Sequence, residues 1–193
     1  MQIFCVVIPG YQEEKRIASV VTAVRRHCPD VVVVDDGSAD KTSDEARKAG
    51  AIVIRHEQNM GKGAALKTGV KYAADKGYSF LITMDADGQH DPDDIPSLLN
   101  ARELTGCPVI VGNRMDNPAA IPFVRRLTNR FMSWLLSRKM GQKVPDTQSG
   151  YRLYQCDVVQ NMLGESSRFA AESEVLLNLA DRGVKIGSAP IKI

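Results

Sequence analysis

The feature that most constrains this chain is a repeated alternation of short apolar runs with longer amphipathic stretches. Five runs have the composition of strands buried on both faces: Ile3–Ile8, Val31–Val34, Ala51–Ile54, Phe80–Met84 and Val109–Val111. The stretches between them carry apolar residues at helical spacing, as in Ile17, Val20, Val21 and Val24. Because strands that alternate with helices form a mostly parallel sheet with right-handed crossovers, we predict an α/β fold with helices flanking a central sheet.

Length and composition indicate one domain. The chain has 193 residues, of which 44% are hydrophobic and 25% charged, so residues 1–193 suffice for a full α/β core. The formal charge of +2 gives no support to nucleic acid as a partner. The four cysteines are scattered without metal-binding spacing, which favours a reducing cytoplasm, and no apolar run approaches the ~20 residues of a membrane span.

The run Phe80–Met84 ends abruptly in acidic residues. Asp85 and Asp87 follow the strand, and Asp91 with Pro92 is typical of a helix start. Open α/β sheets bind ligands at the carboxyl ends of their strands. Two adjacent carboxylates repel each other unless a divalent cation lies between them. An isolated Asp-x-Asp is more often a solvated acidic turn, so the pair needs support from other segments.

That support comes from three other predicted strands, which also end in polar residues. With the acidic pair included, the four strand ends carry Tyr11 and Glu13, Asp35 and Asp36, Asp85 and Asp87, and Asn113 and Arg114. Parallel strands bring these ends to one edge of the sheet, although loops are polar in any protein. Gly61-Lys62-Gly63 adds backbone N–H groups and a cation at a helix start, which suits an anion. The alternative is a plain glycine-rich helix start, and the Walker A spacing is absent.

Taken in order, these segments resemble glycosyltransferase family 2. The motifs are VVIPGYQEE, VVVVDDGSADKT, NMGKGAALKTG, ITMDADGQHDPDDI and VGNR, followed by DTQSGYRLY and ESEVLLNLADRGVKIGSAPI. The last two are similar to the dolichol-phosphate mannose synthase and polyprenyl-phosphate glycosyltransferase branch. The resemblance implies a GT-A fold and inverting transfer of a sugar from a nucleotide-diphosphate donor of the GDP-mannose or UDP-glucose type.

The resemblance also implies roles for individual residues. The base and ribose would contact Pro9, Tyr11, Glu13, Val34 and Asp36; the metal would be held by Asp85, Asp87 and Gln89; Ala86 would lie against the nucleotide and Arg114 against the phosphates. Mg²⁺ or Mn²⁺ suits two carboxylates and an amide oxygen. Members that the chain resembles continue into a further basic segment, so we expect this chain to be shortened at its C-terminal end.

The acceptor decides whether a general base is needed. A hydroxyl must lose a proton, and Asp146 is then the candidate base, with a helix cap or loop hydrogen bond as the alternative. A lipid phosphate is already anionic at neutral pH and requires cations instead. Arg130 is our candidate among the cations of a predicted basic amphipathic helix, in which Arg125, Arg126, Arg130, Arg138, Lys139 and Lys143 interleave with Phe123, Val124, Leu127, Phe131, Trp134 and Leu135.

This helix leads us to expect a lipid-linked phosphate acceptor and action at the inner face of the cytoplasmic membrane. The alternative for the helix is a core-facing stripe with a solvated cationic face. Two other functions stay open: transfer to a polysaccharide, lipid or protein hydroxyl, and nucleotide-sugar binding without activity. A nucleotidyltransferase is disfavoured because no Gly-x-Gly-Thr-Arg-like loop follows the first strand. The histidines form no metal-spaced cluster, and His90 is expected at the solvated surface.

Overall fold

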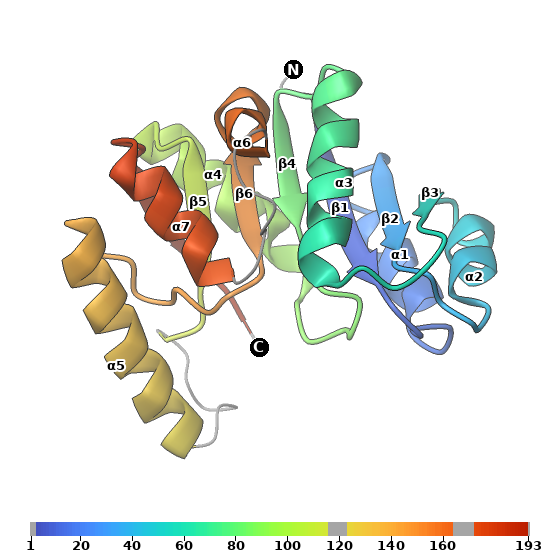
Figure 1. Ribbon diagram of the computed structural model, residues 1–193, viewed down its shortest axis with the longest axis horizontal. Helices are drawn as coiled ribbons and strands as arrows, with labels where there is room; N and C mark the ends of the chain where they lie inside the picture. The colour runs from blue at the N-terminus through green and yellow to red at the C-terminus, as the bar shows by residue number, and fades with distance from the viewer. Residues whose placement is uncertain (1–2, 116–122, 164–171, 193) are drawn as a thin grey trace.

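The computed structural model describes residues 3–115, 123–163 and 172–192. Its core is a seven-stranded sheet of order β3-β2-β1-β4-β6-β5-β7 (Figure 1). The strands are β1 (Phe4–Gly10), β2 (Val31–Asp35), β3 (Ile52–Arg55), β4 (Phe80–Thr83), β5 (Val109–Asn113), β6 (Arg152–Gln155) and β7 (Ile186–Pro190). The five predicted strands are present, with shifts of one or two residues at several of their ends.

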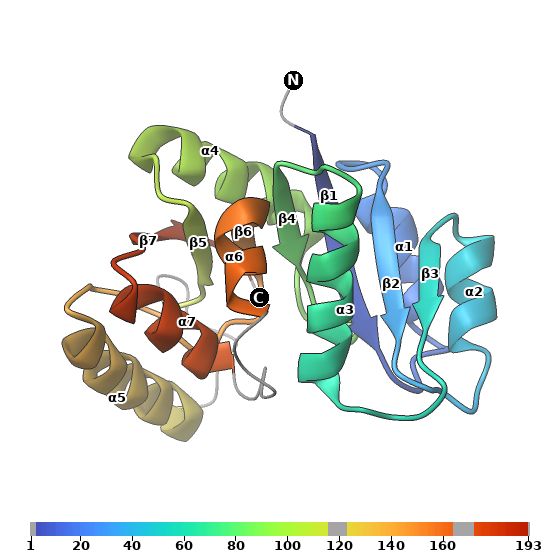
Figure 2. The ribbon, with the colours of Figure 1, turned by 45° about the horizontal axis from the view of Figure 1, so that its top comes forward.

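The sheet is mostly parallel, as the alternation of strands and helices predicts. Strands β1, β2, β3 and β4 run in the same direction (Figure 2), and β7 is parallel to β5. The exception is β6, which lies antiparallel between β4 and β5. This strand was not predicted, because its four residues RLYQ contain no continuous apolar run. Because β4 and β5 are both antiparallel to β6, β5 runs in the same direction as β4. The carboxyl ends of β1, β2, β4 and β5 therefore lie at one edge of the sheet.

Helices cover both faces of the sheet. They are α1 (Ile17–Val24), α2 (Thr42–Lys48), α3 (Lys62–Asp75), α4 (Ile95–Thr105), α5 (Phe123–Met140), α6 (Cys156–Leu163) and α7 (Glu172–Asp181), with a 3₁₀ turn η1 at Pro92–Asp94. Residues of α1, α2 and α4 belong to one hydrophobic cluster, and those of α3, α6 and α7 to the cluster on the opposite face. As predicted, Asp91 caps the turn before α4, where its side chain accepts a hydrogen bond from the backbone of Asp93.

Helix α3 lies unusually close to the central strand β1. A Cβ atom at Gly69 would lie 2.2 Å from Cγ1 of Val7, so only glycine allows this approach. The close packing fixes the amino end of α3, and therefore Lys62, beside the carboxyl edge of the sheet.

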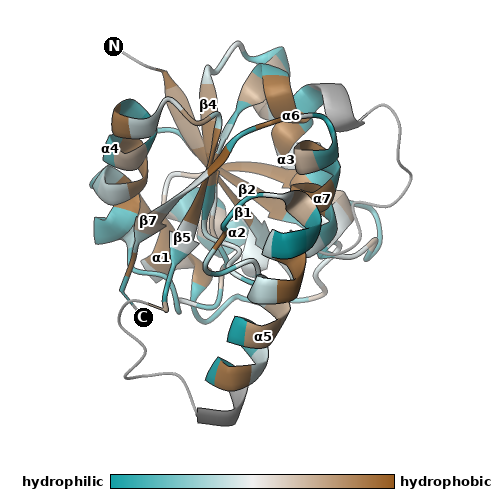
Figure 3. Cartoon of the chain, turned by 90° about the vertical axis from the view of Figure 1, so that its left-hand side faces the viewer, coloured by the Kyte–Doolittle hydropathy of each residue, from teal (hydrophilic) through white to brown (hydrophobic). Residues whose placement is uncertain are grey.

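Helix α5 extends away from the sheet and contacts α7 (Figures 1 and 3). Within the described part of the chain, no helix combines the length and the apolarity needed to cross a membrane. The four cysteines are all free thiols.

Candidate functional site

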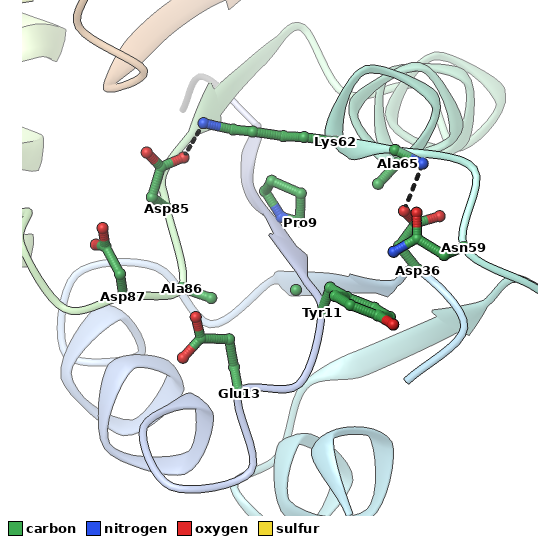
Figure 4. A pocket seen from close by; sticks show the side chains of 12 residues that line it. Pro9, Tyr11, Glu13, Asp36, Asn59, Lys62, Ala65, Asp85, Ala86 and Asp87 are labelled. Atoms are coloured by element: carbon green, nitrogen blue, oxygen red, sulfur yellow. Dashed lines mark hydrogen bonds and ion pairs between the residues drawn. The ribbon is translucent and has the colours of Figure 1, made fainter. Parts of the chain in front are cut away.

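A pocket of about 310 Å³ opens at the carboxyl edge of the sheet (Figure 4). We call it the first pocket. It is lined by Pro9, Gly10, Tyr11, Glu13, Asp36, Asn59, Gly61, Lys62, Ala65, Asp85, Ala86 and Asp87. These residues come from the ends of β1, β2 and β4 and from the amino end of α3. The edge thus brings together most of the residues that the sequence predicts for nucleotide and metal binding.

Two residues predicted for this site do not line the pocket. The side chain of Val34 is fully buried in the hydrophobic core on the α3 side of the sheet. Gln89 is exposed, and its backbone N–H donates a hydrogen bond of 2.9 Å to Oδ1 of Asp87. The assignments of Val34 to the base and of Gln89 to the metal therefore stay predictions that the pocket geometry does not support.

Asp36 joins the end of β2 to the start of α3. Its carboxylate accepts hydrogen bonds from the backbone N–H groups of Met60 (2.9 Å) and Gly61 (2.7 Å) and lies 2.7 Å from Nδ1 of His56. Burial acts to raise the pKa of Asp36, but these hydrogen bonds together outweigh burial and lower the pKa below its ordinary value. Sequence reasoning missed His56, because the residue is separated from Asp36 by twenty positions and belongs to no recognisable motif.

Asp85 lies between two cationic or polar partners. The ammonium Nζ of Lys62 is 2.6 Å from one carboxylate oxygen, and Nε2 of His90 is 3.7 Å from the other. Burial acts to raise the pKa of Asp85, but the contacts with His90 and Lys62 outweigh burial and hold the pKa well below its usual range. Asp85 is therefore an anion in the folded protein at neutral pH.

The prediction of a solvated surface role for His90 is wrong. The residue is buried, and its ring packs against Tyr151, with the ring centroids 5.0 Å apart. Tyr151 directly precedes β6, so this contact depends on the position of a strand that the sequence pattern did not reveal.

The acidic pair fits a divalent cation that takes its other ligands from the substrate. Among the residues described, no three His, Cys, Asp or Glu side chains gather into a metal-binding group. Mg²⁺ is commonly held by one or two carboxylates together with waters and substrate phosphates, and Asp85 and Asp87 both line the pocket. The ammonium of Lys62 against Asp85 marks a position that attracts a cation.

Arg114 and Asp146, which the sequence assigned to separate roles, form one ion pair. Nε and Nη2 of Arg114 lie 2.7 Å and 3.0 Å from the two carboxylate oxygens of Asp146. The side chain of Asp146 is fully buried. This geometry favours the alternative in which Asp146 makes a hydrogen bond from its loop, here to Arg114 at the end of β5, since a general base needs an oxygen that reaches the acceptor. Neither residue lines the first pocket.

A second pocket, of about 380 Å³, lies between α5 and the segment that follows it. Its lining residues are Met115, Arg130, Ser133, Trp134, Ser137, Lys143, Val144 and Pro145. Two serines on one face of α5 connect the helix to the segment on the other side of the second pocket. Ser137 accepts a hydrogen bond from the backbone N–H of Val144 at 2.9 Å, and Ser133 accepts one from the backbone N–H of Thr147 at 3.0 Å. The second pocket is thereby attached to the loop that carries Asp146.

Most of the described apolar side chains of α5 face solvent, whereas Met140 is buried and Leu136 packs against the core. Leu127, Phe131, Met132, Trp134 and Leu135 are all exposed, with Phe131 at 59% and Trp134 at 57%. The cations Arg130, Arg138, Lys139 and Lys143 are exposed as well. These findings contradict the alternative of a core-facing stripe for the described side chains; those of Phe123, Val124 and Arg125 lie outside the described part.

Comparison with known proteins agrees with this architecture. The sequence model of Glycosyl transferase family 2 matches residues 5–163. A UDP-N-acetylglucosamine–dolichyl-phosphate N-acetylglucosaminyltransferase of Methanococcus voltae is 32% identical over 209 residues, covering 96% of this chain and 83% of that protein. A polyprenol monophosphomannose synthase of Mycolicibacterium smegmatis is 28% identical over 200 residues, covering 96% of this chain and 75% of that protein.

The fold has close counterparts among solved structures. Glucosyl-3-phosphoglycerate synthase from Mycobacterium tuberculosis, in complex with Mn²⁺, uridine diphosphate and phosphoglyceric acid, superposes with a TM-score of 0.77 at 22% sequence identity. The match covers 100% of this chain and 69% of that one. This likeness establishes the expected GT-A arrangement of the sheet and helices.

Proposed function

Because the chain belongs to glycosyl transferase family 2, and is a glycosyltransferase by that membership, we propose that it transfers a sugar from a nucleotide-diphosphate donor to a polyprenyl phosphate. The donor would occupy the first pocket and the acceptor phosphate the second. The named relatives act on dolichyl phosphate and form a polyprenol monophosphate sugar, which supports this choice of acceptor.

In the first pocket, the chain's own residues would orient the donor. Tyr11, Glu13 and Asp36 lie at the ends of β1 and β2, where they would contact the nucleoside. Asp85 and Asp87 would hold Mg²⁺ or Mn²⁺, and the cation would take up negative charge that develops on the leaving diphosphate. The backbone N–H groups at the amino end of α3 and the ammonium of Lys62 would add positive charge beside the phosphates.

The observation that carries the acceptor assignment is the charge of the second pocket. Among the residues that the structure describes, its lining includes the cations Arg130 and Lys143 and no carboxylate. A phosphate monoester has a second pKa of about 6, so it is already a nucleophilic anion at neutral pH and needs no base. A pocket built for a hydroxyl acceptor would instead require a carboxylate or histidine within reach.

The exposed apolar surface of α5 supports a membrane location for the acceptor. The residues Leu127, Phe131, Trp134 and Leu135 would enter the boundary between head groups and acyl chains. The cations on the same helix would contact anionic head groups. A polyprenyl chain would then stay in the bilayer while its phosphate reaches the second pocket.

The experiment that tests the proposal compares Arg130→Ala with Arg138→Ala in transfer from UDP- and GDP-sugars to a polyprenyl phosphate. Both changes remove one exposed arginine from α5, but only Arg130 lines the second pocket. A charge-assisted hydrogen bond contributes about 1.5–3 kcal/mol, so Arg130→Ala should lower kcat/KM about ten- to a hundredfold. Arg138→Ala should change it by less than about threefold. Equal losses in the two variants would contradict a specific phosphate contact at Arg130.

A further inference from the structure

We infer that Lys62 is a built-in counter-ion that occupies the cation position at Asp85 until a nucleotide arrives, and that it then moves to the diphosphate. The inference deepens the proposed function and rests on it for the identity of the diphosphate. Its consequence is that metal and nucleotide bind together, because metal alone must compete with the ammonium.

The placement of Lys62 is the first argument. The residue is the first of α3, and its side chain extends across the first pocket to Asp85 at the end of β4 (Figure 4). The side chain is 45% exposed, so it has room to move. The preceding Gly61 has φ of 93° and donates its N–H to Asp36, so the backbone at the start of α3 is fixed while the lysine stem is flexible.

The charges around the pair are the second argument. With Nζ at 2.6 Å from one carboxylate oxygen, the ammonium lies where a divalent cation would coordinate Asp85. The ammonium of Lys62 and a divalent cation cannot both lie close to that carboxylate oxygen, because the two cations repel each other. A diphosphate beside the amino end of α3 offers Lys62 another anion and offers the metal additional oxygen ligands. The two ligands therefore favour each other through a single side-chain displacement.

The test is a titration of Mn²⁺ alone into wild type and Lys62→Gln, followed by the same titration with saturating UDP or GDP. Bound Mn²⁺ is measured by electron paramagnetic resonance of the free ion, which requires no catalytic activity. Without nucleotide, Lys62→Gln should bind Mn²⁺ about two- to fivefold more tightly, since a half-exposed ion pair contributes up to about 1 kcal/mol. With nucleotide this gain should disappear, and the affinity for UDP or GDP should fall about ten- to a hundredfold.

Lys71→Gln is the matched control. Lys71 lies on the same helix, pairs with Asp75 at the surface, and carries the same charge. It should leave both titrations unchanged within about twofold. Unchanged or weaker binding of Mn²⁺ alone in Lys62→Gln would overturn the inference. Tighter binding both with and without nucleotide would also overturn it, because Lys62 would then only repel the metal. Failure of the wild type to bind UDP and GDP would instead count against the proposed function, while the titration of Mn²⁺ alone still tests Lys62.

Discussion

Arg114 and Asp146 form a two-point ion pair that joins the end of β5 to the loop before β6. The guanidinium donates to both oxygens of a carboxylate that is fully buried, and the backbone N–H of Arg114 lies 3.3 Å from one of them. Removal of one member of a buried pair leaves the other without its counter-charge. The two residues therefore act as one unit, and substitution of either one changes the environment of the other.

We predict that Asp146→Asn lowers the free energy of unfolding by about 3–5 kcal/mol. The asparagine keeps the shape of the side chain and removes the charge that compensates Arg114. Urea denaturation of wild type and variant measures the change.

The double variant Arg114→Gln/Asp146→Asn separates loss of the pair from other effects. Its loss of stability should be clearly smaller than the sum of the two single losses, since neither charge remains buried alone. Additive losses would contradict a coupled pair. Because Asp146→Asn also disturbs Arg114, its loss of activity alone is no evidence for a general base.

Asp36 should make stability depend on pH in the acid range. Burial acts to raise its pKa, but hydrogen bonds from Met60, His56 and Gly61 lower the pKa below its ordinary value of about 3.9. A group with a depressed folded-state pKa stabilises the fold above its unfolded pKa and loses this contribution as pH falls toward the folded value. The difference in unfolding free energy between wild type and Asp36→Asn should therefore shrink as the pH falls below about 4. A difference that grows on acidification would contradict the assignment.

Asp87→Ala should remove a metal ligand and leave the fold intact. Its carboxylate accepts a hydrogen bond from the backbone N–H of the exposed Gln89, and loss of such a surface contact should lower stability by less than about 1 kcal/mol. Calorimetry with UDP and GDP should show an affinity in the presence of Mn²⁺ that is at least about tenfold weaker, and little change without metal. Asp75→Ala, which removes an exposed carboxylate on α3, is the control. Equal nucleotide affinity in wild type and Asp87→Ala, with and without Mn²⁺, would exclude this metal site.

Trp134 offers a direct optical test of the membrane contact proposed for α5. It is the only tryptophan of the chain and is 57% exposed. Vesicles that contain anionic lipid should shift its fluorescence to shorter wavelength and protect it from aqueous quenchers, because the ring enters a less polar environment. Added salt should weaken the response. An unchanged spectrum at saturating lipid would contradict membrane contact through this face.

Much of the fold and of the first pocket could be predicted from the sequence, for a physical reason. Buried parallel strands are continuous apolar runs, so the points where these runs stop at Asp36 and Asp85 mark the edge where ligands bind. Strand β6 was not predicted because it begins with Arg152, a charged residue that is nevertheless buried. Its guanidinium donates hydrogen bonds to the carbonyl groups of Thr147 and Ser149, and hydropathy does not reveal this arrangement.

The partners of the site residues could not be predicted. His56 with Asp36 and Arg114 with Asp146 are contacts between residues 20 and 32 positions apart, and His90 reaches Asp85 within the segment that follows β4. Each depends on how the loops fold back at the carboxyl edge, and no local spacing records that. The family resemblance implied roles for individual residues, whereas the structure shows which side chains these residues contact.

The most direct test of the proposed acceptor is a side-by-side measurement of labelled sugar transfer to a polyprenyl phosphate and to the free polyprenol of the same length. The two lipids differ only in the phosphate, so membrane partition and chain recognition are matched. We predict transfer to the phosphate with retention of the label in the lipid phase, and a rate at least about a hundredfold lower with the alcohol, because a hydroxyl needs a general base and the described lining of the second pocket contains no carboxylate or histidine. Equal or faster transfer to the polyprenol would contradict the proposal that this glycosyltransferase acts on a lipid phosphate.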